Sequence, residues 1–250
     1  MTTSINPAPP KPSLWQSLFG IIDKPTNTFK AVLAYPSWLR WGLPLLILLL
    51  AFTVVTAAQT PFMRDIALQQ AEAQLAQMSD EQVEAARATM EFTMSLPFML
   101  ATGIGFGLIA LVIGVLAQTA YFYFATMLTG GDDTNFGAMF TISAWTRLPL
   151  AIGFLVQAAF VWVSQGAIRY PGLAPLVASG NALEDAKNPI IPLLARFDLF
   201  WLWHLLLVVL GVAVVARISR SKSLLLTLIY VVLVLGMAVV PSLIARAFGG

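Results

Sequence analysis

The chain has 250 residues, of which 58% are apolar and only 10% charged, and its mean hydropathy is +0.81. A soluble domain carries about 25% charged and about 45–50% apolar residues. These proportions argue against a soluble enzyme, a disordered protein and a nucleic-acid-binding protein, and they predict a multi-pass membrane protein. The net charge is only +2, and without cysteine the chain can form no disulfide, thiolate nucleophile or cysteine-ligated zinc site.

The first 40 residues are predicted to form a cytoplasmic tail with two interfacial amphipathic helices. Residues 1–12 contain no apolar run beside a cleavage site, so we expect no cleaved secretory signal. Ser13 and Gln16 fit a helix-capping box. The helix after them gathers apolar residues on one face: Leu14, Trp15, Leu18, Phe19 and Ile22. This helix, and a second one after Pro25, are too short to span a membrane, so we expect both to lie in the headgroup layer; a partner-docking helix is the alternative.

Five apolar stretches are long enough to span a membrane. A spanning helix needs about 20 apolar residues to cross a hydrocarbon core of about 30 Å, and lipid satisfies no backbone hydrogen bonds, so these stretches must be helices. They are residues 41–58, 96–127, 148–165, 199–216 and 223–243. The sequence therefore predicts an all-α integral membrane bundle of five transmembrane helices, forming a membrane domain over residues 41–250.

The basic residues predict the orientation of the bundle. With the N-terminus in the cytoplasm, 8 of the 14 Lys and Arg residues fall in inside segments and 6 outside. The two tight basic clusters, before the first span and in the 217–222 turn, both fall inside. Because positive charge in short loops favours the cytoplasmic side, we expect the N-terminus inside and the C-terminus outside.

The stretch at about 60–94 is the only strongly polar part of the chain. It holds six of the 12 acidic residues, and its apolar residues recur at helical spacing. Ser79 can cap a second helix, with Gln82 at its third position. The pattern predicts an extracytoplasmic helical hairpin. A solvated hairpin is the preferred interpretation, and a docking site for an external partner is the alternative.

The second span carries a repeat of small residues at spacings of four, three, four and three. Such residues share one helix face and let neighbouring helices approach closely in lipid. The predicted helix-packing face consists of Gly103, Gly107, Ala110, Gly114 and Ala117.

Several short segments together resemble the Yip domain family (Ypt-interacting proteins), in its bacterial form. They are WQSLFGII at 15–22, KP at 24–25, YP at 35–36, GG at 130–131, TNF at 134–136, RLP at 147–149, DLFWLWH at 198–204 and SRSKS at 219–223. The resemblance implies a helical integral membrane protein and places it in a bacterial inner membrane. Eukaryotic members bind prenylated small GTPases and one another, and they affect vesicle traffic.

Polar residues at membrane depth are functional candidates. The candidate polar pocket or partner contacts are Arg147, Gln157, Asp198 and His204. Three of them have plainer interpretations: Asp198 as a helix cap, His204 as an interfacial or packed histidine, and Arg147 as an interface anchor. The alternative for Arg147 is an ion pair with Asp132 or Asp133, and Gln157 can hydrogen-bond across helices. A lone histidine cannot supply the three or four ligands of a zinc site, and we expect no catalytic, metal or cofactor site.

The favoured function is a non-enzymatic membrane organiser that binds membrane lipids or protein partners, with homo-oligomers expected. The alternative is a transporter or channel for a small solute, ion or lipid, which would use the candidate polar pocket. A lipid-modifying enzyme is the weakest of the three, since the sequence shows no nucleophile and base in a recognisable context.

Overall fold

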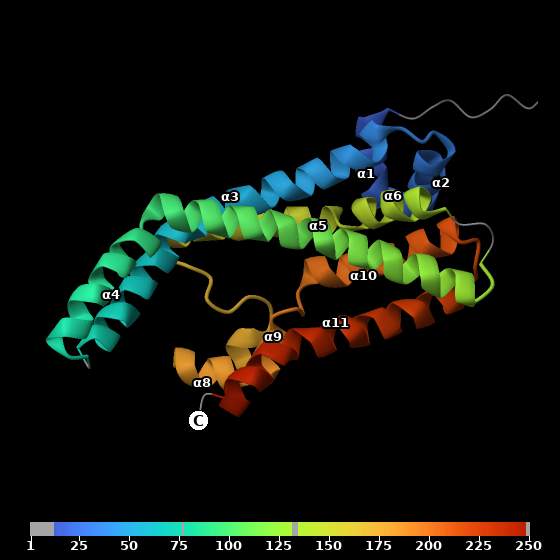
Figure 1. Cartoon of the computed structure of the whole chain (residues 1–250). Coiled ribbons are helices and arrows are strands. Elements are labelled where there is room, and N and C mark those ends of the chain that lie inside the picture. Colours follow the sequence, from blue (N-terminus) through green and yellow to red (C-terminus); the bar gives the residue numbers. More distant parts are fainter. Residues whose placement is uncertain (1–12, 77, 132–134, 249–250) are drawn as a thin grey trace, which may run out of the picture.

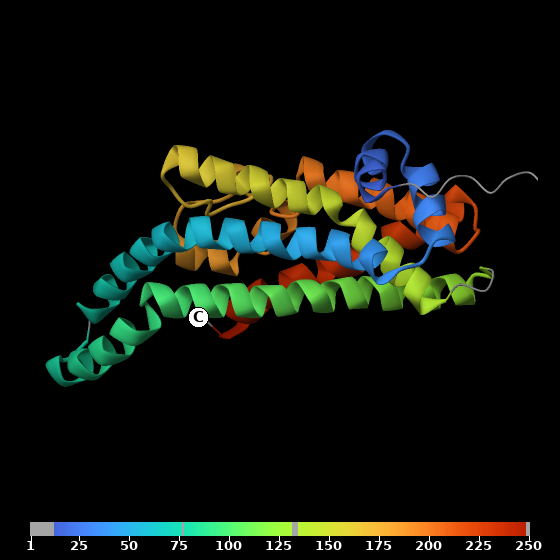
Figure 2. The same ribbon diagram turned by 90° about the horizontal axis from the view of Figure 1, so that it is seen from above.

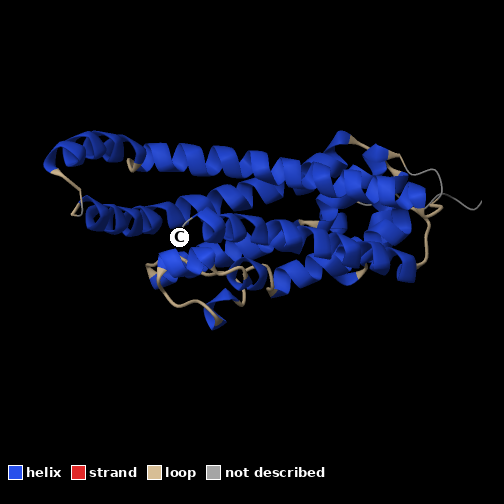
Figure 3. Ribbon diagram, turned by 60° about the horizontal axis from the view of Figure 1, so that its bottom comes forward, coloured by secondary structure: helices blue, strands red, loops and turns tan. Residues whose placement is uncertain are grey.

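The computed structural model describes residues 13–76, 78–131 and 135–248, and over these residues the chain folds into helices and loops without a strand (Figure 3). This confirms the predicted all-α class. The elements in chain order are α1 (Leu14–Asp23), α2 (Pro25–Ala34), α3 (Trp38–Leu75), α4 (Asp80–Thr93), α5 (Leu96–Leu128), α6 (Phe136–Thr146), α7 (Leu148–Ser164), the 3-10 turn η1 (Ala174–Leu176), α8 (Ala182–Lys187), α9 (Ile190–Leu194), α10 (Leu199–Val215) and α11 (Arg220–Phe248).

Four helical stretches among the described residues are long and apolar enough to cross a membrane. They are Trp38–Glu72, Leu96–Leu128, Phe136–Ser164 and Arg220–Ala247. The third combines α6 and α7, so it begins at Phe136 rather than at the predicted residue 148. The predicted span at 199–216 coincides with α10, whose 17 residues amount to about 25 Å of helix against a core of about 30 Å.

The two N-terminal helices fold onto one end of the bundle (Figure 2). The predicted capping box is confirmed: Ser13 Oγ accepts from Gln16 N at 3.1 Å, and Gln16 Oε1 accepts from Ser13 N at 2.8 Å. The apolar face of α2 is buried in the protein. Phe29 and Val32 of this face are buried, and Phe29 packs against Gly211 of α10. The apolar residues of α2 therefore stabilise the bundle, whereas α1 leaves Trp15, Phe19 and Ile22 exposed.

The long helix α3 continues well past its apolar part and, with α4, projects beyond the opposite end of the bundle (Figure 1). The second helix of the pair begins at Asp80, directly after the predicted cap residue Ser79. Arg64 Nε donates to the Met94 carbonyl at 2.7 Å and so fastens α3 to the chain just before α5.

The segment after α7 packs its short helices α8 and α9 against α11. Its anchor is Asp185, whose carboxylate accepts hydrogen bonds from the Tyr170 hydroxyl, from Ser179 and from the Gly180 amide. The Tyr170 hydrogen bond is the largest of the effects that hold the pKa of Asp185 below its usual range. Gly172 adopts a φ of +60°, and an added Cβ would lie 2.8 Å from the Leu194 carbonyl oxygen, so the turn requires glycine.

The deepest part of the core surrounds the junction between α6 and α7. Every residue from 142 to 149 is buried, in contrast to α5, most of whose surface faces outward. Phe29 of α2, Trp145 of α6 and Leu207 of α10 meet there in one apolar cluster. This junction is therefore the place where the N-terminal helices and the bundle are joined.

Candidate functional site

The helix break between α6 and α7 positions a buried polar cluster. Pro149 lies in the first turn of α7. Proline has no backbone N–H, so in a helix running unbroken from α6 to α7 it could not donate a hydrogen bond to the carbonyl four residues earlier. The chain therefore ends one helix at Thr146 and restarts at Leu148, with Arg147 as the capping residue of both. Carbonyl groups at such a break need other partners. Some are local, since Arg147 N donates to the Ala144 carbonyl, and others come from neighbouring helices.

Arg147 points from the break towards α5. Its Nη2 donates to the Gly114 carbonyl at 2.6 Å and to Gln118 Oε1 at 2.8 Å, and its buried Nε has no hydrogen-bond partner among the described residues. No acidic side chain of the described residues forms an ion pair with Arg147. Arg147 is thus a buried cation held by neutral acceptors, which is a costly arrangement at membrane depth.

His204 approaches the same break from α10. Its Nδ1 lies 2.7 Å from the Thr146 carbonyl oxygen, so Nδ1 carries the proton and donates it. Gln118 completes the cluster by donating to Thr146 Oγ1 at 3.3 Å and accepting from the Tyr230 hydroxyl at 3.5 Å. Polar side chains from α5, α10 and α11 therefore converge on the α6–α7 break.

The cluster lies deep in the bundle rather than at its end. Gln118 and Tyr230 each lie ten residues, or about 15 Å of helix, from the ends at Leu128 and Arg220. Those two ends are neighbours, since Lys222 Nζ donates to the Thr129 carbonyl at 3.4 Å. A depth of about 15 Å is half the thickness of a typical hydrocarbon core.

The structure brings two of the four candidate pocket residues together. Arg147 and His204 both lie at the helix break, since His204 contacts the carbonyl of Thr146, the residue before Arg147. Gln157 lies ten residues, about 15 Å, further along α7. Asp198 accepts from Trp201 N at 2.8 Å and caps α10, which is the plainer role expected for it. Asp132 and Asp133, the candidate ion-pair partners of Arg147, lie outside the described residues.

Sequence reasoning did not connect Thr146 and Tyr230 with this cluster. Tyr230 was detectable as a hydroxyl within an otherwise apolar span, by the same rule that selected His204. Thr146 contributes its backbone carbonyl as well as its hydroxyl, and no side-chain pattern signals a backbone acceptor.

Only part of the predicted small-residue face of α5 lies against other parts of the protein. Gly103 faces Thr56 of α3, an added Cβ at Gly107 would overlap the Phe52 ring, and Gly114 lies beside Arg147. The two alanines of the pattern, Ala110 and Ala117, are exposed. The three glycines thus lie against α3 and the polar cluster, and the alanines face outward.

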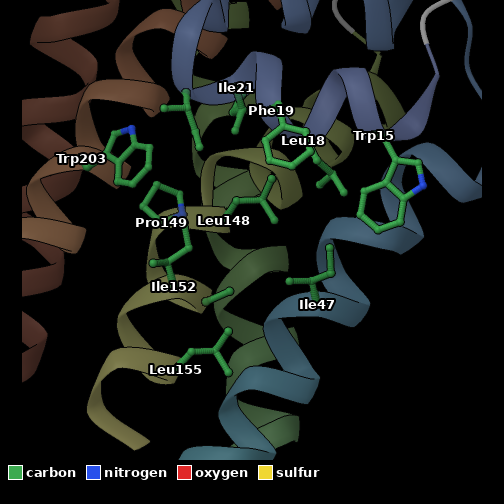
Figure 4. A pocket seen from close by; sticks show the side chains of 12 residues that line it. Trp15, Leu18, Phe19, Ile21, Ile47, Leu148, Pro149, Ile152, Leu155 and Trp203 are labelled. Carbon is green, nitrogen blue, oxygen red and sulfur yellow. The ribbon is translucent and has the colours of Figure 1, made fainter. Parts of the chain in front are cut away.

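An apolar groove lies between α1 and the helices beneath it (Figure 4). Leu18 and Phe19 of α1 line one wall, Ile152 and Leu155 of α7 line another, and Trp203 of α10 closes one side. The volume is about 210 Å³, and its surface is almost entirely apolar. We call this feature the α1 groove.

The Yip1 domain family model matches residues 19–243 of this chain, which is nearly its whole length and includes the polar cluster and most of the α1 groove. The chain belongs to the Yip1 domain family. This confirms the resemblance seen in the sequence, and with its long apolar helices it makes the chain a multi-pass membrane protein. No curated protein and no solved structure matches the chain. The Yip1 family is in general non-enzymatic.

Proposed function

We propose that this Yip1-domain protein is a non-enzymatic membrane organiser that binds lipids or protein partners through its first helix. The observation that carries the proposal is the exposed apolar face of α1, where Trp15, Phe19 and Ile22 are each more than half exposed at the rim of the α1 groove. Exposed aromatic and aliphatic side chains on an amphipathic helix bind a membrane surface or a partner.

The packing of α1 against the rest of the protein supports this proposal, because it holds the exposed face of α1 in a fixed position. Ile21 is buried in the core around Trp145, and Gly20 lets α2 approach so closely that an added Cβ would lie 2.5 Å from Thr28 Oγ1. A helix held in this way keeps its outer face in one orientation relative to the spans.

The proposal includes five spans in a bacterial inner membrane. The first 40 residues and the 217–222 turn lie in the cytoplasm, α10 is the short fourth span, and the α3–α4 hairpin and the C-terminus lie outside. We expect a reporter enzyme inserted at 217–222 to be active inside the cell and one fused after Gly250 to be active outside. A cytoplasmic C-terminus would overturn the five-span arrangement.

The organiser role predicts protein contacts that depend on α1. In crosslinked native membranes, deletion of residues 14–22 is expected to abolish reproducible crosslinks, either to other proteins or between copies of this chain. The sharper variant Phe19→Glu places a charge on the apolar face, where Phe19 is 69% exposed, and is expected to have the same effect.

Gln16→Glu is the matched control, because it adds the same charge to α1 while keeping a residue that suits the capping box. It should retain the crosslinks of the natural protein. Two results would contradict the organiser proposal: the natural protein gives no reproducible crosslinks, or Phe19→Glu leaves its crosslinks unchanged.

Transport of a small anion is the second candidate, and the helix break at Arg147 favours it. Broken helices deep in a membrane line substrate sites in transporters. This candidate predicts chloride efflux from proteoliposomes that is lost in Arg147→Ala and reduced in His204→Ala, with the exposed Arg246→Ala as control. Efflux that is the same in all three variants would exclude this site as the path.

A further inference from the structure

The α1 groove opens sideways onto a surface that lipid covers. Leu155 in its wall is 47% exposed, and beyond it α7 continues with exposed Phe160 and Val163. These residues belong to the candidate membrane span Phe136–Ser164. The mouth of the groove is therefore continuous with the outward apolar face of a spanning helix.

The apolar wall of the groove and its opening along α7 favour hydrocarbon as its content. Water is scarce in the membrane interior, and an empty space would forfeit the dispersion contacts of every side chain around it. Acyl chains are the apolar molecules present at high concentration along α7, and they need no polar partner in a wall that offers almost none.

The size of the groove narrows the choice of occupant. Its volume of about 210 Å³ is smaller than the roughly 300–1,000 Å³ of pockets that bury drug-sized ligands. An α-helix with its side chains is about 10–12 Å across, so a partner helix could insert no more than a side chain. A single flexible alkyl chain matches both the shape and the lateral opening.

We propose that the α1 groove binds one acyl chain of a bilayer phospholipid, which enters along α7 and is covered by α1. Leu18 and Phe19 lie over the chain, Ile152 and Leu155 lie beneath it, and Trp203 limits its advance towards α10. This inference rests on the proposed function, since it identifies the lipid class and the site through which α1 engages the membrane.

Photo-crosslinking of a labelled lipid tests this site. The full chain is reconstituted in phosphatidylcholine vesicles that contain a phosphatidylcholine with a diazirine in its acyl chain, and the labelled residues are mapped by mass spectrometry. Label is expected to concentrate on residues 18–22 and 148–155. The reference is the outward face of α5 around Phe106 and Ile113, which contacts lipid without a groove.

Leu155→Trp fills the groove from its mouth and is expected to reduce label on residues 18–22 by about fivefold, a change equivalent to roughly 1 kcal/mol of binding free energy. Val156→Trp is the matched control, because Val156 is 51% exposed on the same helix but does not line the groove. It should leave the labelling pattern unchanged.

Equal label on the groove and on α5, or equal effects of the two tryptophan variants, would overturn the lipid site. Crosslinking of residues 18–22 to a second copy or another protein in place of lipid would overturn it as well. Leu155→Trp changes no residue of α1, so loss of lipid label with protein crosslinks retained separates the failure of this site from the failure of the organiser role.

Discussion

Replacing Trp145 with alanine is expected to destabilise the protein by about 3–5 kcal/mol, the usual cost of removing a large aromatic side chain from a core. Trp145 is 0% exposed and lies where α2, α6 and α10 meet. Its indole Nε1 also donates to the Arg40 carbonyl at 2.5 Å, which joins α6 to the start of α3. The alanine variant leaves a cavity and removes this hydrogen bond.

The measurement is the temperature at which the detergent-solubilised protein loses its monodisperse peak in size-exclusion chromatography. A loss of this size corresponds to a decrease of about 10 °C for a chain of this length. Trp162→Ala is the control, since Trp162 is 79% exposed and its removal should change this temperature little. Equal decreases for the two variants would show that the junction around Trp145 does not hold the fold together.

Trp145→Phe separates the two contributions at this position. Phenylalanine keeps most of the ring packing but cannot donate to Arg40, so its decrease should fall between those of the alanine variant and the control. The comparison measures how strongly a single hydrogen bond fastens the first span to α6.

Local chemistry made several features predictable from the sequence. The capping box at Ser13 and the cap at Asp198 depend on residues three positions apart, and both are present. The apolar runs located the long helices because lipid permits few alternatives to a helix. The family resemblance was recognisable for a similar reason, since its prolines, glycines and aromatic residues mark helix ends along most of the chain.

Packing between distant segments was not predictable in the same way. Trp145 and Arg40 are 105 residues apart, and nothing near either one identifies its partner. Within a membrane, outward and inward faces are equally apolar, so hydropathy does not reveal which face packs. For this reason the burial of Ile21 was not predicted, although Trp15 and Phe19, which were placed on the outward apolar face of α1, are exposed.

In the polar cluster, residue type predicted which side chains are unusual in a span, but it did not predict which of them lie together. His204 and Arg147 were selected because polar groups in spans are rare, and both lie at the break between α6 and α7. Gln157 satisfied the same rule but lies about 15 Å further along α7. His204 contacts the Thr146 carbonyl, which the helix break leaves available, and Gln118 donates to the Thr146 hydroxyl. This grouping could be recognised only in the three-dimensional structure.

Gly107→Leu is expected to have the second large effect, because this glycine of α5 lies directly against the Phe52 ring of α3. An added Cβ would overlap the ring of Phe52, which is itself fixed edge-on against Phe154 of α7 at 5.6 Å between ring centroids. A leucine side chain therefore displaces two aromatic rings at once. Overpacking of this kind costs about 1–3 kcal/mol, and we expect reduced abundance in membranes and a lower unfolding temperature in detergent.

Gly105→Leu provides the matched control two residues away. An added Cβ at Gly105 meets nothing within 4 Å, so leucine there changes the same helix in the same lipid without a clash. If both variants behave alike, the effect comes from the loss of glycine flexibility in α5 and the α3–α5 contact is not responsible. If only Gly107→Leu is destabilised, and Phe52→Ala restores it by making room, the close approach of these two helices is required for the bundle to assemble.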